Sequence, residues 1–442
     1  MSEVVERQEH NLKYFLNKPL VERCLNWFKL LSITGGGQGL VQLIGFITGI
    51  VVIRLLSFDQ YAFYTLANTM LGTMGILANG GIAAGVMVQG GKVWQDRERL
   101  GAVVACGIQL RRTFAFFSFA ASGPILVWLL LRNGASWWVA LGIAVAVVPS
   151  FVATLSSRIF NTPLRLHQQV WPLQRISVGA NLLRLAGTLP VLFAWPAAIG
   201  ALLVNGLAEI FANLRLRRAA APYADFRAAP DPETRTHIVA MVRRVLPNAM
   251  YFSFSSQLGV FLVSFFGSAV AIAELGALSR IGMALALVKS VVMTLIVPRF
   301  TKLPEESPRV VRRFSQVQGM LWILAGPLLL LVYFFANPIL WILGPEYAGL
   351  QWELLLMTAG SLVALAAFTT ERLNESRGWV IPPHFFIPAA LALQVAVAAA
   401  LRPSTAATGF AYTLVIQLAI YAVYVLFFVK RANRHKRLRV DT

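Results

Sequence analysis

The sequence predicts an all-α, polytopic membrane protein with about twelve transmembrane helices, arranged as two six-helix halves around a central cavity. Hydrophobic residues make up 57% of the 442 residues and charged residues only 13%, whereas a soluble domain has about 25% charged residues. Apolar stretches long enough to cross about 30 Å of hydrocarbon recur from end to end. Backbone groups in lipid must pair within helices or closed barrels, and these stretches are too long for barrel strands.

The connections between the first six expected spans alternate between short ones and polar, basic ones. Three arginines, Arg158, Arg165 and Arg175, interrupt the region of the fourth to sixth spans. Residues 1–27 lack the short apolar core and the small-residue cleavage site of a signal peptide. The expected spans of the first half are 30–53, 61–88, 113–131, 137–157, 172–194 and 196–214.

The second half repeats this organisation after the longest polar insertion between spans. That insertion, residues 215–244, contains three prolines and seven basic residues. The expected spans that follow it are 246–268, 275–298, 316–336, 350–370, 380–401 and 407–429. The predicted parts of the chain are an amphipathic N-terminal segment (1–29), a first bundle (30–214), a linker (215–244), a second bundle (245–429) and a basic tail (430–442).

The net charge of +20 is a topology signal rather than a nucleic-acid footprint. With both termini inside, 33 basic residues fall in the inner connections and tails, three in the outer connections and three within spans. Basic residues in short loops favour the cytoplasmic side. Both termini are therefore expected in the cytoplasm, where the positive charge also attracts anionic lipid.

Two segments suggest an internal repeat. Residues 45–70, "GFITGIVVIRLLSFDQYAFYTLANTM", align with residues 259–284, "GVFLVSFFGSAVAIAELGALSRIGMA", so that Gln60 lies opposite Glu274. Each segment leaves one apolar run, makes a short outer turn and enters the next run. Six spans per half give both halves the same orientation, which predicts parallel repeats with a substrate site between them.

The chain resembles polysaccharide flippases of the Wzx type. Residues 35–87 look like their first two spans, with Arg54-Leu55-Leu56 at the "RLL" position and residues 61–64, "YAFY", where "FGLY" is usual. Residues 273–303 and "LWILGPEYAG" (340–349) resemble later motifs of that family. Ser57 and Phe58 depart from the usual Gly-Pro, and Ala62 from the usual Gly.

This resemblance implies the fold of the multidrug/oligosaccharidyl-lipid/polysaccharide exporter superfamily. It further implies a bacterial inner-membrane flippase that moves a lipid-linked oligosaccharide to the outer leaflet by alternating access. The implied partners are a polyprenyl-(pyro)phosphate-linked glycan and the phospholipid bilayer, with a glycan polymerase and glycosyltransferases as candidate protein partners.

The residues favour passage of a substrate over catalysis. All five histidines fall in expected cytoplasmic ends or loops, and no cluster of His, Cys or Asp has metal-ligand spacing. No P-loop and no Ser-His-Asp set is present in the sequence. We therefore expect no enzyme activity, no cofactor, no metal and no nucleic-acid partner.

Four cations are candidates for contact with an anionic substrate. Arg280 and Lys289 lie in the eighth expected span, Arg184 in the fifth, and Arg54 at the outer end of the first. Cations in a membrane are expensive and usually face water or a partner, and Arg holds phosphate bidentately. The alternatives are snorkelling of Arg54 with a pair to Asp59, and an interfacial position for Arg184. The nine-residue spacing directs Arg280 and Lys289 to opposite sides of an ideal helix.

Polar uncharged residues complete the predicted site. Gln38 and Gln42 share one face of the first span, and Asn248, Tyr251 and Ser255 form a stripe along the seventh. Such a stripe suits a sugar, although helix–helix hydrogen bonding explains it equally. Glu353, near the outer end of the tenth span, is a candidate for proton coupling or a surface residue.

Three alternative functions remain open at this stage. A multidrug or organic-cation antiporter of the same fold requires carboxylates in the cavity, where this chain has mainly Arg and Lys. A lipid II flippase usually has fourteen spans, against twelve expected here. A scaffolding membrane protein needs none of these cavity residues.

Overall fold

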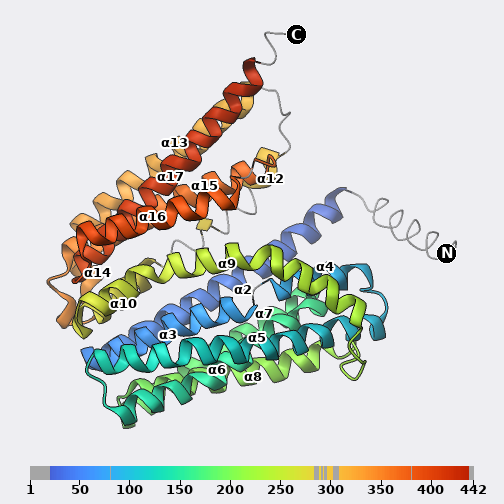
Figure 1. Cartoon of the computed structure of the whole chain (residues 1–442), viewed down its shortest axis with the longest axis horizontal. Coiled ribbons are helices and arrows are strands. Elements are labelled where there is room, and N and C mark those ends of the chain that lie inside the picture. The colour runs from blue at the N-terminus through green and yellow to red at the C-terminus, as the bar shows by residue number, and fades with distance from the viewer. Residues whose placement is uncertain are drawn as a thin grey trace.

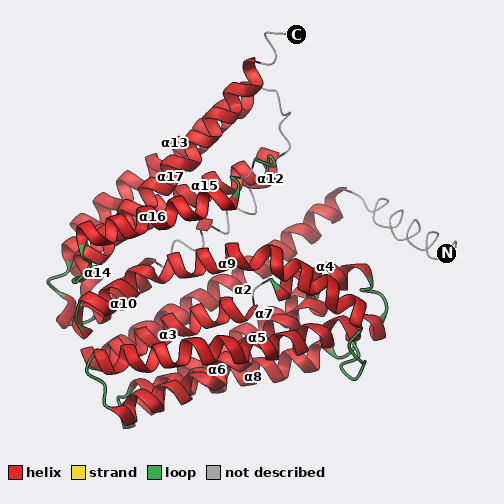
Figure 2. Cartoon of the chain, viewed as in Figure 1, coloured by secondary structure: helices red, strands yellow, loops and turns green. Residues whose placement is uncertain are grey.

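The computed structural model describes residues 20–79, 81–282, 288–289, 292, 296–301, 308–379 and 381–437. In this described part, the regular structure is helical throughout (Figure 2). The fold class expected from the sequence is therefore confirmed. Most of the predicted amphipathic segment 1–29 lies outside the described residues, apart from the start of the first helix at Leu20.

Seven helices of the first half are described. α3 and α4 are bent by 42° relative to each other, and together they are long and apolar enough to count as one broken span. A glycine, Gly81, adopts a left-handed conformation (φ 92°) at their junction, which favours Gly because it has no Cβ. The helices are α2 (Leu20–Leu55), α3 (Phe58–Asn79), α4 (Ile82–Lys92), α5 (Arg97–Arg132), α6 (Trp137–Leu166), α7 (Val170–Ala194) and α8 (Ala198–Ala220).

The second half begins with two helices that pack against the first half. The described helices are α9 (Pro232–Phe266), α10 (Ala269–Gly282), α12 (Val297–Thr301), α13 (Pro308–Phe334), α14 (Ala336–Leu343), α15 (Gln351–Glu375), α16 (Pro383–Leu401) and α17 (Ala406–Arg437), with a 3-10 turn, η2 (Pro345–Tyr347). Nine described helices are long and apolar enough to cross a membrane, or up to eleven if each of two bent pairs is a single span. The expected eighth span, 275–298, runs through residues outside the description.

The helices extend beyond the apolar stretches on the basic side of the molecule. Residues 97–112, expected in a connection, belong to α5, and residues 158–166 belong to α6. The linker predicted at 215–244 is shorter, because α8 continues to Ala220 and α9 begins at Pro232. Arg, Glu, Gln and Leu are good helix formers, so a helix continues after its apolar core has ended. Hydropathy marks the lipid-facing length and not the helix end.

The short linker, residues 221–231, packs onto α5. The amide of Asp225 donates to the carbonyl of Arg97 (3.0 Å), and a Cβ at Gly101 would lie 2.1 Å from the carbonyl oxygen of Asp225. Asp231 caps α9 by accepting from the amides of Glu233 and Thr234. The hydrogen bonds from Thr234 lower the pKa of the exposed Asp231 carboxyl.

Helix α9 packs along the first half, whereas the later helices of the second half approach the first half at one end of the molecule and diverge from it toward the other (Figure 1). The end with the α2–α3, α5–α6 and α9–α10 turns is called the far end, and the end with Leu20 and Arg437 the near end. At the far end, α10 packs against α3, and α14 against α2. Toward the near end, α13, α15 and α17 lie away from the first half (Figure 1).

The structure corrects the register of the internal repeat. The α2–α3 turn lies between Leu55 and Phe58, and the α9–α10 turn between Phe266 and Ala269. The turns therefore place Leu55 opposite Phe266, three residues from the register of the sequence alignment, in which Leu55 faces Ala269. Gln60 caps another helix of the first half, since its side-chain oxygen accepts a hydrogen bond from the amide of Ala198 (3.0 Å) at the start of α8.

Candidate functional site

Two arginines of the first half bind the C-terminal ends of helices from the second half. Arg54, at the end of α2, donates from Nε to the carbonyl oxygen of Ile342 (2.9 Å) and from a terminal nitrogen to that of Trp341. Its guanidinium carbon lies 5.2 Å from the centre of the Trp341 ring. The last carbonyls of a helix lack intrahelical partners and carry partial negative charge, so a cation there is favourable.

Arg132, at the end of α5, makes the second contact of this kind. Its Nε and a terminal nitrogen donate to the carbonyl oxygen of Phe265 in the last turn of α9 (3.2 and 2.7 Å). The neighbouring Asn133 donates to the carbonyl of Ser264 (3.2 Å). Arg54 and Arg132 therefore connect the two halves at the far end. No ion pair between Arg54 and Asp59 occurs among the described residues.

Helices α3 and α10 approach closely just inside this end. A Cβ at Gly276 would lie 2.3 Å from the hydroxyl oxygen of Thr65, closer than real Cβ atoms approach. Only a glycine lets the two helices reach this separation without movement of Thr65. The contact surface continues into a buried core that both halves share, to which Tyr61 and Leu66 of α3 and Ile272 of α10 belong.

Arg280 lies between the halves, one turn further along α10. Its side chain packs against Gly49 of α2, with its Cδ 3.3 Å from the position of a Cβ there. The guanidinium carbon is 6.0 Å from the centre of the Tyr64 ring, and its charge interacts with the phenol groups of Tyr61 and Tyr64. Among the described residues, no carboxylate forms an ion pair with Arg280.

A hydroxyl-lined cavity of about 360 Å³ lies on the other side of α10, within the second half. Ser255 of α9 and Ser279 of α10 line it, together with Ser361, Tyr412 and Thr413 of α15 and α17. The buried hydroxyl of Tyr412 has no hydrogen-bond partner among the described residues. No Asp or Glu is among the described residues that line this cavity, so it offers neutral polar groups to a ligand.

The predicted polar stripe of the seventh span is partly engaged within the protein. Gln394 of α16 is buried and donates to the hydroxyl oxygen of Ser255 (2.5 Å) and to that of Tyr251 (3.4 Å). These bonds join α9 to α16. Helix–helix hydrogen bonding therefore accounts for Tyr251 and for one face of Ser255. The side chain of Asn248 lies outside the description.

Lys289 faces the second half, opposite to Arg280. Its Nζ lies 5.5 Å from the centre of the Phe368 ring on α15, and Arg372 lies over the same ring at 5.3 Å. Arg372 in turn pairs with Glu371 (3.2 Å) and with Glu375. Among the described residues, Arg280 therefore contacts α2 and α3, whereas Lys289 contacts α15.

The remaining predicted residues lie apart from this inter-half contact. Arg184 of α7 forms an ion pair with Glu209 of α8 (3.1 Å), with the two side chains 28% and 26% exposed. Along α2, Gln38 is exposed and Gln42 is partly buried. Glu353 lies close enough to Glu274 of α10 for the two carboxylates to repel each other, which is an arrangement that sequence spacing alone does not reveal.

Sequence reasoning missed several residues of the far-end and inter-half contacts. The sequence indicated Tyr61 and Tyr64 only as part of a family motif. Arg132 was only one of the three basic residues in the outer connections. The spacing of Tyr61, Tyr64 and Thr65 on one helical face is the signal that could have identified them.

Neither a protein-family model nor a curated protein matches this sequence. Solved structures do match. An inward-facing MATE family multidrug resistance transporter of the MOP superfamily is 14% identical over 90% of this chain and 96% of its own, with a TM-score of 0.71. The outward-facing form of a MATE transporter gives 0.62 at 14% identity, covering 93% of this chain and 96% of its own.

The lipid II flippase MurJ, in an inward closed conformation, is also similar. Its TM-score is 0.68 at 13% identity, over 90% of this chain and 87% of MurJ. The chain therefore has the MOP-superfamily fold, as a polytopic helical membrane protein. At these identities, the similarity concerns the fold alone.

Proposed function

We propose that this protein is a flippase that moves a lipid-linked oligosaccharide across the membrane by alternating access. Arg280 carries the proposal. It is a cation between the two halves that lies near the rings of Tyr61 and Tyr64, and among the described residues no carboxylate forms an ion pair with it. An arginine in this position can bind a phosphate or pyrophosphate bidentately, in surroundings where water is depleted.

The cavity of the second half supports a carbohydrate headgroup. Its serine, threonine and tyrosine hydroxyls offer neutral hydrogen bonds, and no described carboxylate lines it. A drug cation is better served by carboxylates, because an arginine between the halves repels it. Glu274 and Glu353 lie at the far end and are candidates for a shared proton that couples transport to a proton gradient.

The direction of transport follows from the charge distribution. The basic connections and tails favour a cytoplasmic near end, so the contacts of Arg54 and Arg132 at the far end would hold the outer side closed. Two negative charges moving outward gain about 4.6 kcal/mol from an inside-negative potential of about 100 mV. Rocking of the halves would break the contacts of Arg54 and Arg132 and open the far end.

The test is reconstitution of the purified protein into liposomes. We expect transfer of a polyprenyl-pyrophosphate-linked glycan to the opposite leaflet, measured by its accessibility to a soluble glycosidase. Lipid II and a cationic dye are the competing substrates, the first suggested by the similarity to MurJ and the second by the similarity to MATE transporters. Transport of the dye without transfer of either lipid-linked substrate would overturn the proposal.

A further inference from the structure

Arg111 of α5 is a buried cation that no described residue satisfies by a hydrogen bond or an ion pair. Its side chain is only 3% exposed, and none of its three guanidinium nitrogens has a hydrogen-bond partner among the described residues. Arg158 of α6 lies close enough to repel it. Burying an uncompensated charge is costly, so this position indicates a ligand of opposite charge.

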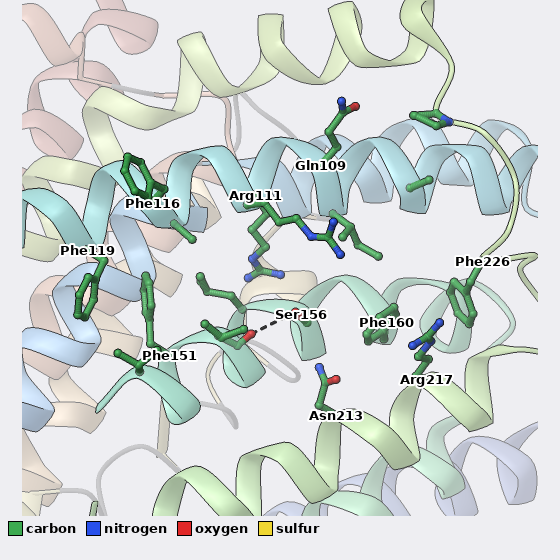
Figure 3. A pocket seen from close by; sticks show the side chains of 18 residues that line it. Gln109, Arg111, Phe116, Phe119, Phe151, Ser156, Phe160, Asn213, Arg217 and Phe226 are labelled. Carbon is green, nitrogen blue, oxygen red and sulfur yellow. Dashed lines mark hydrogen bonds between the residues drawn. The ribbon is translucent and has the colours of Figure 1, made fainter. Parts of the chain in front are cut away.

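Arg111 lines a cavity of about 730 Å³ in the first half, between α5, α6 and α8. Arg112 and Arg217 contribute two further cations to its wall, and Ser156 and Asn213 face the same space (Figure 3). Asn213 and Ser156 are already engaged within the protein, since Asn213 donates to the carbonyl of Ala153 and Ser156 to the carbonyl of Val152 in its own helix. The described lining contains no Asp or Glu, so the arginines determine what binds.

Toward residues 116–119 of α5, the cavity becomes aromatic and apolar (Figure 3). Phe119 and Phe151 line it, and Phe116 and Val152 continue it onto the surface, with Phe116 70% and Val152 53% exposed. A ligand that suits both the arginines and the aromatic region has an anionic group at one end and hydrocarbon at the other. Arg111 and Arg112 directly precede the apolar stretch 113–131, at the depth expected for lipid headgroups.

We propose that this cavity binds the phosphate of an anionic membrane lipid. Arg111 is the buried anchor, Arg112 and Arg217 flank the phosphate, and the acyl chains run along Phe116 and Phe119. This site is separate from Arg280 and belongs to one half only, so a bound lipid would brace α5, α6 and α8 against each other during rocking. The inference does not depend on which substrate is transported.

The experiment uses the full chain in an uncharged detergent, with lipid binding measured by native mass spectrometry and by the shift in Tm. The probes are dioleoylphosphatidylglycerol, dioleoylglycerol, which lacks the phosphate, and inorganic phosphate. We expect phosphatidylglycerol alone to bind and to raise the Tm. Equal stabilisation by inorganic phosphate would show that free phosphate is the ligand, and equal stabilisation by dioleoylglycerol that no phosphate is recognised; both outcomes overturn the proposal.

Three variants distinguish binding at this site from a general effect of positive charge. Two of them, Arg111→Met and Arg217→Gln, change the cavity, and the control Arg175→Gln removes an exposed cation of α7. Arg111→Met should weaken phosphatidylglycerol binding at least tenfold while leaving the lipid-free Tm unchanged or higher, because an unpaired buried charge is removed. Arg217→Gln, at the exposed rim, should weaken binding several-fold, which keeps the test valid if Arg111→Met does not fold. A folded Arg111→Met protein that binds phosphatidylglycerol with wild-type affinity would overturn the proposal. If Arg111→Met does not fold, wild-type affinity in Arg217→Gln would overturn it.

Discussion

The Nε of Arg54 donates a 2.9 Å hydrogen bond to the carbonyl oxygen of Ile342, 288 positions further along the chain. This bond joins the last turn of the first helix to the C-terminal end of α14 in the other half. Together with the bonds from Arg132 to Phe265, it closes the far end. Two cations expected to lie in outer connections therefore hold the two halves together in the observed state.

Loss of the Arg54 contact should favour opening of the far end. Hydrogen bonds from charged groups contribute about 1.5–3 kcal/mol, so Arg54→Gln should raise the open-to-closed ratio roughly 10- to 100-fold. The measurement is labelling of a cysteine at Thr65, which is buried in the closed state, by a membrane-impermeant maleimide in a cysteine-free background. Arg402→Gln, which removes another far-end cation, is the matched control and should label like the parent; equal labelling of Arg54→Gln would show that the contact does not hold the far end closed.

The close approach of Gly276 to Thr65 should be sensitive to a single methyl group. Gly276→Ala places a carbon 2.3 Å from the Thr65 hydroxyl, so α3 and α10 must separate. Overpacking of this kind costs about 1–3 kcal/mol. We expect a lower Tm, and recovery in the double variant Gly276→Ala/Thr65→Ala, which removes the clashing atoms. A double variant as unstable as Gly276→Ala alone would mean that another contact sets the distance.

Replacement of Arg280 should stop transport without unfolding the protein. We expect Arg280→Ala to reduce transfer of the lipid-linked glycan at least tenfold, and Arg280→Lys to restore only part of it, because a point charge replaces a planar fork. Transport and Tm are measured on the same preparations, with Arg312→Ala, an exposed cation of the same half, as control. Full transport by a folded Arg280→Ala protein would transfer the phosphate-binding role to Lys289 or Arg54.

The pair between Arg184 and Glu209 should behave as a structural unit. Removing one partner leaves an isolated charge in a membrane-spanning helix, which costs about 2.5–3.5 kcal/mol by insertion scales. We therefore expect Arg184→Ala and Glu209→Ala each to lower the Tm more than the double variant does. Transport by the double variant then tests substrate contact: retained transport assigns Arg184 to structure, and a selective loss of transport in a stable protein assigns it to the substrate.

The sequence determined the fold class and the order of apolar and basic segments along the chain. Each of these properties can be evaluated segment by segment. The apolar length of a segment decides whether it spans the membrane, and the basic residues in its flanking loops favour one side of the membrane, whatever the other segments do. Helix ends are different, since α5 and α9 continue through polar residues where no hydropathy signal remains.

Only the tertiary structure decided which polar residues meet. Arg54 finds two carbonyls of α14 rather than Asp59, Arg184 finds Glu209, and Ser255 finds Gln394. Arg111, counted as one more cytoplasmic cation, is buried because α6 and α8 close over it. Each of these pairings depends on the separation and rotation of helices distant in sequence, and steric fit at positions such as Gly276 sets that separation.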